Sequence, residues 1–143
     1  VPLVDDNLPA IRASLTLAGQ PVTVWAVHPV PPFRARGHQL RAAQLAWVGA
    51  QLQSDEATAI ILGDLNTTPF GSPFRHLQNQ AAVKSAALGH GLAPTWRRSP
   101  LPPMLALDHV LVSENVYTKG YVVGADIGSD HYPVTADLRL AFP

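Results

Sequence analysis

The stretch that decides the fold is "TAIILGDLN", residues 58–66, a short apolar run that ends in polar residues. An unbroken apolar run of this length is typical of a strand that is buried on both faces, near the centre of a sheet. Asp64 and Asn66 stand where the run ends, at the edge where a sheet meets its loops. The sequence therefore predicts a central strand that carries two hydrogen-bonding side chains at its end.

The segments on either side predict further strands with helices between them. Alternating and β-branched residues favour strands at 13–19, 21–29, 106–115, 116–125 and 132–140. The first two are expected to form an antiparallel hairpin. Helical periodicity favours a helix at 37–54, and a Ser-Pro start favours a second at 72–80. Residues 84–104 are rich in Gly and Pro and predict a loop. These elements predict a layered α/β or α+β fold with helices flanking mostly antiparallel or mixed sheets.

The bulk composition excludes several classes of protein. The 143 residues are 47% hydrophobic and 14% charged, which is typical of one globular domain. No apolar run approaches the ~20 residues that span a bilayer. Ten basic and ten acidic residues cancel, whereas a non-specific nucleic-acid binder usually has a basic excess. The absence of cysteine excludes disulfides, zinc–thiolate sites and thiol nucleophiles, and it leaves the cellular compartment open.

Polar side chains gather where the predicted core strands begin or end. This set comprises His28, Asp64, Asn66, Asp108, Asp130 and His131. Three carboxylates at the ends of apolar strands are costly to bury unless they share a cation or a ligand. Aspartate, an Asn carbonyl and water are the ligands that Mg²⁺ or Mn²⁺ prefers.

Each of these residues also has a structural explanation when taken alone. Asp64 fits turn chemistry after a strand, Asp108 fits a turn cap, and Asp130 fits an Asx turn. His28 alone is more often a satisfied histidine of the core or rim. The combination favours a site, because turn residues have no reason to be joined by two histidines at strand ends.

The motifs that carry these residues resemble a known superfamily. "GDLNTTP" (63–69), "LDHVLVS" (107–113) and "GSDHYPV" (128–134) follow a strand that ends in His28. In this order they resemble the endonuclease/exonuclease/phosphatase superfamily of Mg²⁺-dependent phosphoesterases. That superfamily includes pancreatic deoxyribonuclease, abasic-site endonucleases, inositol polyphosphate 5-phosphatases and neutral sphingomyelinases. The resemblance implies a four-layered sandwich, of which this chain would be the C-terminal portion.

The resemblance also implies roles for the residues at the strand ends. Asp64 matches the Asp that positions or deprotonates the attacking water, and Asn66 matches the Asn that hydrogen-bonds the phosphoryl group. His28 matches a His that some members use as a phosphate contact or an acid.

The last motif completes the implied site. Asp130 matches a carboxylate of the metal site, for Mg²⁺ or Mn²⁺. His131 matches the catalytic His, and Asp108 matches the carboxylate that orients it. Such a partner fixes the tautomer of the imidazole and favours its protonated form, which suits a group that faces a phosphorane-like transition state.

The loop before Asp108 is expected to hang over this site. Trp96 could stack on a base, a sugar or a lipid headgroup, and Arg97 could meet a phosphate. A surface loop with one anchored Trp explains the same residues. The expected substrate is a phosphate ester, whether nucleic acid, phospholipid or small phosphoester, and the neutral net charge favours the smaller or lipid substrates over DNA.

One expected part of the family's site is missing from this sequence. The family's first half supplies a Glu that ligates the metal, and residues 1–27 contain no Glu. We therefore expect residues 1–143 to form a single domain that is the C-terminal portion of a longer one. Such a portion would bind metal weakly and expose a sheet face or edge, through which it could form a homodimer.

Two function classes follow from these observations. Bacterial members of the superfamily with similar sequence motifs have unassigned substrates, and some of them carry N-terminal membrane-spanning segments. The whole protein could therefore be tethered to a membrane. A non-catalytic binding or scaffold module on the same fold is the alternative to a metal-dependent phosphoesterase. The retention of Asp64, Asn66, Asp108, Asp130 and His131 favours the enzyme.

Overall fold

The fold is built around one five-stranded mixed sheet. The computed structural model describes residues 10–54, 57–91, 93–98, 100 and 102–141. The strands are β1 (Ile11–Leu17), β2 (Gln20–Ala26), β3 (Thr58–Asp64), β4 (Val83–Ser85) and β5 (Asp108–Ser113), and their order in the sheet is β1-β2-β3-β5-β4. The predicted strand at 58–66 is the middle strand, parallel to β2 and antiparallel to β5.

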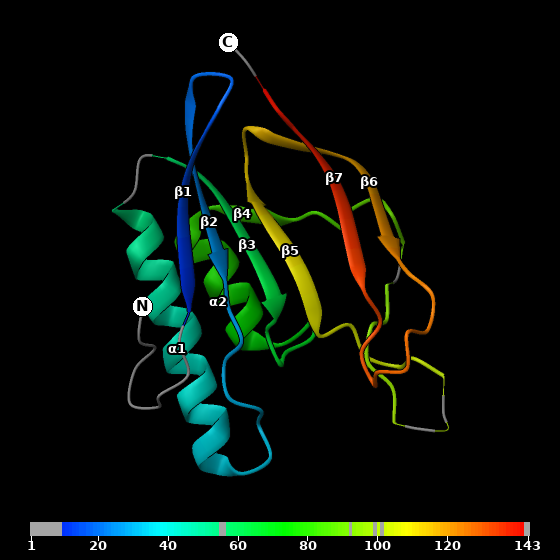
Figure 1. Cartoon of the computed structure of the whole chain (residues 1–143). Helices are drawn as coiled ribbons and strands as arrows, with labels where there is room; N and C mark the ends of the chain where they lie inside the picture. Colours follow the sequence, from blue (N-terminus) through cyan, green and yellow to red (C-terminus); the bar gives the residue numbers. More distant parts are fainter. Residues whose placement is uncertain (1–9, 55–56, 92, 99, 101, 142–143) are drawn as a thin grey trace.

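Two helices cover one face of this sheet. α1 (Ala35–Gln53) and α2 (Ser72–Ala81) lie side by side against it (Figure 1). Alternate residues of β3, Ala59 and Ile61, point into the core beneath the helices, where they meet buried side chains such as Leu45 and Phe74. The burial of this apolar surface is the main stabilisation of the helix layer.

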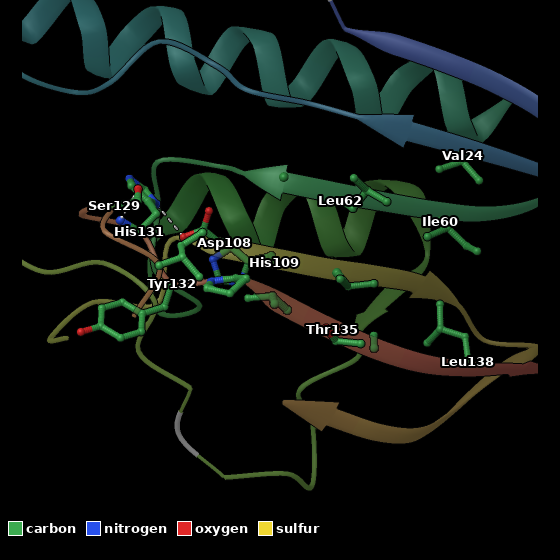
Figure 2. A pocket seen from close by; sticks show the side chains of 16 residues that line it. Val24, Ile60, Leu62, Asp108, His109, Ser129, His131, Tyr132, Thr135 and Leu138 are labelled. Atoms are coloured by element: carbon green, nitrogen blue, oxygen red, sulfur yellow. Dashed lines mark hydrogen bonds and ion pairs between the residues drawn. The ribbon is translucent and has the colours of Figure 1, made fainter. Parts of the chain in front are cut away.

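A separate hairpin faces the other side of the sheet. It consists of β6 (Val116–Val123) and β7 (Val134–Leu140), paired antiparallel (Figure 1). A cavity of about 640 Å³ separates β7 from β3 and β5. Its labelled side chains include Ile60 and Leu62 from β3 and Leu138 from β7 (Figure 2). The sheet face that the helices do not cover is therefore apolar, and Leu62 remains 37% exposed.

The structure confirms the predicted fold class and most of the predicted elements. The other five predicted strands and both predicted helices also lie within a few residues of their expected positions. The exception is β4, which falls at the start of a segment predicted as loop. A strand of three residues is too short to show the period-2 alternation that identifies strands in a sequence. Among the described residues, no helix is both long and apolar enough to cross a membrane.

Candidate active site

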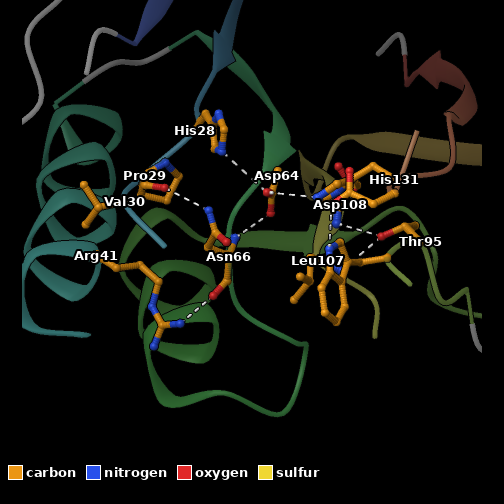
Figure 3. Close-up of polar contacts among 12 residues, drawn as sticks. His28, Pro29, Val30, Arg41, Asp64, Asn66, Thr95, Leu107, Asp108 and His131 are labelled. Atoms are coloured by element: carbon orange, nitrogen blue, oxygen red, sulfur yellow. Dashed lines mark hydrogen bonds and ion pairs between the residues drawn. The ribbon is translucent and has the colours of Figure 1, made fainter. Parts of the chain in front are cut away.

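The candidate active site forms where the ends of three strands meet. The antiparallel register of β3 and β5 places Asp64 directly opposite Asp108. The backbone of β2 continues alongside β3, because Val27 N–H donates to the carbonyl of Leu62 at 2.9 Å. This pairing brings His28 Nε2 to 3.5 Å from Asp64 Oδ2 (Figure 3).

Gly63 allows this close approach of the two strands. Its φ of +135° is unfavourable for side chains other than hydrogen, and a Cβ there would clash with the carbonyl oxygen of Val27. The glycine before Asp64 is thus a requirement of the backbone that positions the carboxylate beside His28.

The second sheet contributes the other histidine. His131 lies just before β7 and donates its Nδ1–H to Asp108 Oδ2 at 2.8 Å (Figure 3). Its second ring nitrogen, Nε2, lies 3.7 Å from Asp64 Oδ2. Asp64 Oδ2 therefore lies between the imidazoles of His28 and His131, and Asp108 supports His131 from behind.

The electrostatic environment raises the pKa of both Asp64 and His131. Burial lowers the pKa of His131, but the hydrogen bond and charge of Asp108, with the charges of Asp64 and Asp130, outweigh this and raise it overall. For Asp64, burial raises the pKa and the nearby Asp108 adds to the rise, against the lowering effect of the Asn66 N–H and both histidines. Asp64 thereby becomes a better proton acceptor, and His131 is favoured in its charged form.

Asp64, Asp108 and His131 could hold a metal ion. One ligand atom from each lies within 4.8 Å of the others, and all three side chains are half-buried. Two carboxylates fit Mg²⁺ or Mn²⁺, which prefer oxygen ligands. Asp130 lies outside this group: its side chain is exposed and accepts a hydrogen bond from Trp96 Nε1 at 3.3 Å. Its assignment as a metal ligand stays a prediction.

Asn66 ties together the two loops that follow β2 and β3. It has a left-handed backbone with φ of 50°, which Asn tolerates better than most residues. Its N–H donates to Asp64 Oδ1 at 2.8 Å, and its Nδ2 donates to the carbonyl of Pro29 at 3.0 Å. These contacts give Asn66 a visible structural role, while its predicted contact with a phosphoryl group stays a prediction.

The two loop residues predicted to bind substrate lie in different environments. Trp96 lines a cavity of about 610 Å³ together with His28, Asp64 and His131. Arg97 is not among the described residues that line it. Its guanidinium instead forms an ion pair with Asp126, Nη2 to Oδ2 at 2.6 Å. The substrate contacts of both residues stay predictions.

The structure adds two residues on α1 that sequence reasoning missed. Arg41 Nη1 donates to the carbonyl of Asn66 (Figure 3). Gln44 Oε1 accepts from Val30 N–H at 2.9 Å. Both side chains are buried, and each holds the backbone of one loop of the site. The sequence could have indicated that these two side chains are buried, because they share the helical face of Leu45 and are the polar residues of an otherwise apolar stripe.

Thr95 and His109 are further missed residues with the same kind of role. The buried hydroxyl of Thr95 accepts the N–H groups of Leu107 and Asp108, each at 3.1 Å, and so holds the start of β5 (Figure 3). Buried His109 donates its Nε2–H to the carbonyl of Thr67 at 2.8 Å. No periodicity distinguishes either residue, since one lies in a loop and the other in an apolar strand.

The fold and the site define a class of protein. A helix-backed sheet meets a second sheet at a cleft in which two carboxylates and two imidazoles converge, an arrangement suited to acid–base hydrolysis. The chain belongs to the Endonuclease/Exonuclease/phosphatase family, whose sequence profile matches residues 1–131. This confirms the resemblance that the motifs indicated.

Solved structures show the same fold. The endonuclease/exonuclease/phosphatase from Beutenbergia cavernae DSM 12333 is 22% identical with a TM-score of 0.71, over 92% of this chain and 39% of that one. The protein of the same name from Bacteroides vulgatus is 20% identical with a TM-score of 0.75, over 92% and 55%. The human Nocturnin catalytic domain with bound sulfate anion is 20% identical with a TM-score of 0.69, over 97% and 56%.

The chain spans between 39% and 56% of the length of the three structures, so it corresponds to part of their fold. A comparison with curated protein sequences gave no significant match.

Proposed function

We propose that the protein is a divalent-metal-dependent phosphoester hydrolase. The observation that carries this proposal is the position of Asp64 Oδ2, 3.5 Å from His28 Nε2 and 3.7 Å from His131 Nε2, with Asp108 behind His131. Membership of the Endonuclease/Exonuclease/phosphatase family supports it.

In the proposed mechanism Asp64 is the base. Its Oδ2 lies between the two imidazoles, where it can take a proton from the water whose oxygen forms the new bond to phosphorus. The bond from phosphorus to the leaving oxygen then breaks. Protonated His131, held by Asp108, faces the negative charge that develops on the phosphoryl oxygens. His28 lies on the other side of Asp64, where it can contact the phosphoryl group or protonate the leaving oxygen.

Carboxylate oxygens of Asp64 and Asp108 are the proposed metal ligands within the chain. His131 Nδ1 is engaged with Asp108, and the raised pKa of His131 favours a protonated ring, which cannot bind a cation. A bound Mg²⁺ or Mn²⁺ would supply Lewis-acid stabilisation of charge on the phosphoryl oxygens. Because the chain spans part of its structural relatives, we expect a further ligand from outside it, and the resemblance implies a Glu.

The test is hydrolysis of bis(4-nitrophenyl) phosphate and 4-nitrophenyl phosphate with Mg²⁺ or Mn²⁺. It compares the full-length protein, the present chain, and full-length Asp64→Asn and His131→Gln variants. The control is Asp137→Asn, which removes an exposed carboxylate of β7. We expect metal-dependent activity in the full-length protein and its control, and a loss in both site variants. Equal activity in Asp64→Asn and the parent would refute the proposed role of Asp64.

A further inference from the structure

A second cavity adjoins the candidate active site. Its volume is about 410 Å³, within the range of about 300 to 1,000 Å³ that is usual for ligand pockets. Thr68 and Leu105 line both this cavity and the 610 Å³ cavity that contains Asp64 and His131. A molecule whose phosphate lay at the site could therefore extend past Thr68 and Leu105 into the second cavity.

The walls of this cavity are mainly apolar, which suits a hydrocarbon ligand. Its main apolar lining residues are Phe70, Leu88, Pro94, Met104, Leu105 and Ala106. Among the described residues that line it, none is Asp, Glu, Lys or Arg. The apolar groups come from the loop after β3 and from the long connection between β4 and β5.

Among the described residues that line the cavity, three of the four polar side chains already bond to the protein itself. Ser85 Oγ accepts from the N–H of Ala87 at 3.2 Å, and Tyr121 OH donates to the carbonyl of Asp108 at 3.4 Å. His109 donates to the carbonyl of Thr67. A nucleobase or a sugar would lose hydrogen bonds to water here and find few replacements, whereas an alkyl chain has none to lose.

Large apolar side chains at the rim of the cavity are exposed to solvent. Phe70 and Leu88 are each 76% exposed, and Met104 is 57% exposed. Grouped exposed apolar side chains beside a pocket are typical of a ligand-binding site. A hydrocarbon ligand would cover them and gain the free energy of their burial.

We propose that this cavity, bordered by Leu88, Met104 and Leu105, is a subsite for the hydrocarbon chain of an amphiphilic phosphoester. The inference rests on the proposed function, and it narrows the substrate class to phosphoesters that carry an apolar chain. A volume of about 410 Å³ leaves room for several methylene groups of such a chain.

The test measures binding separately from catalysis. Methyl-, butyl- and octylphosphonate, which the enzyme cannot hydrolyse at the P–C bond, are titrated calorimetrically into the full-length protein with Mn²⁺, below micelle-forming concentrations. We expect affinity to rise with chain length, by about fourfold for each methylene group that enters the cavity. Leu88→Glu and Met104→Glu should flatten this rise and leave methylphosphonate binding unchanged. Leu17→Glu is the matched control, an exposed apolar residue at the far end of β1 that lines neither cavity.

Each outcome decides the inference. A tenfold or larger gain from methyl- to octylphosphonate, lost in both rim variants and kept in Leu17→Glu, supports the subsite. Methylphosphonate binding and diester hydrolysis without any effect of chain length overturn the subsite and leave the proposed function intact. A chain-length effect that survives both rim substitutions overturns the location. Absence of both phosphonate binding and metal-dependent hydrolysis overturns the proposed function, and the subsite with it.

Discussion

Replacement of Asp64 by Asn should stabilise the metal-free protein and abolish the proposed hydrolase activity. Asp64 and Asp108 are both half-buried, and their ligand atoms lie within 4.8 Å of each other. At an effective dielectric constant of about 20, two negative charges at that distance repel by about 3 kcal/mol. An Asn at this position keeps a carbonyl for the Asn66 N–H, now 2.8 Å from Asp64 Oδ1, but the neutral hydrogen bond is weaker. The expected net stabilisation is about 1 to 2 kcal/mol at alkaline pH, where His131 is uncharged and no longer attracts Asp64.

The stabilisation should depend on pH in a direction that the pKa shifts fix. The folded-state pKa of Asp64 is raised, so its contribution to stability is present below its unfolded pKa and is lost as pH rises through the folded value. The pKa of His131 is raised as well, so its attraction to Asp64 is lost at still higher pH. Asn lacks this pH dependence. The advantage of Asp64→Asn should thus be small at pH 6 and largest at pH 9.

Thermal unfolding at both pH values, with and without Mn²⁺, provides the assay. For a domain of this size about 1 kcal/mol shifts Tm by about 3 to 4 °C, so Asp64→Asn should melt about 3 to 8 °C higher at pH 9 without metal. Added Mn²⁺ should raise the Tm of the parent, because it binds only the folded state, and should have little effect on the variant. The exposed Asp137→Asn is the control. A lower metal-free Tm at pH 9, or a full metal-induced shift in the variant, would refute the reasoning.

Three further substitutions test other contacts of the site and the core. Asp108→Asn should lower the proposed hydrolase activity about 10- to 100-fold, because a charge-assisted hydrogen bond to His131 of about 1.5 to 3 kcal/mol is lost. The pKa of His131 should also fall without its carboxylate partner, so the alkaline limb of the pH–rate profile should move to lower pH. Arg41→Met should lower kcat/KM about tenfold with an unchanged circular dichroism spectrum, because the Asn66 carbonyl loses its donor, and Arg41→Lys should recover part of it. Phe74→Ala should cost about 3 to 5 kcal/mol in urea unfolding, and a cost below about 1 kcal/mol would contradict its place in the core.

The central strand and the convergence of its polar ends could be predicted because each depends on local pattern. The run from Thr58 to Leu62 has no polar residue after its first position, which predicts a central strand buried on both faces. The central position is confirmed, whereas the face of β3 away from the helices borders a cavity and leaves Leu62 37% exposed. Asp64 ends one apolar strand and Asp108 begins another, so antiparallel pairing of these strands brings the two carboxylates near each other. The helices could be predicted from the helical periodicity of their apolar residues, and α2 also from the Ser72-Pro73 pair at its start.

The loop contacts could not be predicted because they depend on tertiary placement. Trp96 donates to Asp130, and Arg97 pairs with Asp126, across segments that the sequence marks only as loops. From the sequence, Arg97 was therefore predicted to bind a phosphate and Asp130 to bind a metal, and their contacts with Asp126 and Trp96 were not foreseen. A loop residue's partner depends on how the chain returns, which periodicity does not encode.

The opposition of Asp64 and Asp108 across β3 and β5 has a consequence for folding. A slip of one residue between these antiparallel strands would turn one of the two carboxylates to the opposite face of the sheet and bury it beneath the helices. The correct alignment and the chemical site are therefore set by the same pairing. A misaligned molecule would be destabilised by the buried charge, and its candidate site would be disrupted. Under the proposed function, the hydrolase activity of a refolded sample would then report the fraction of molecules in which the central strands are correctly aligned.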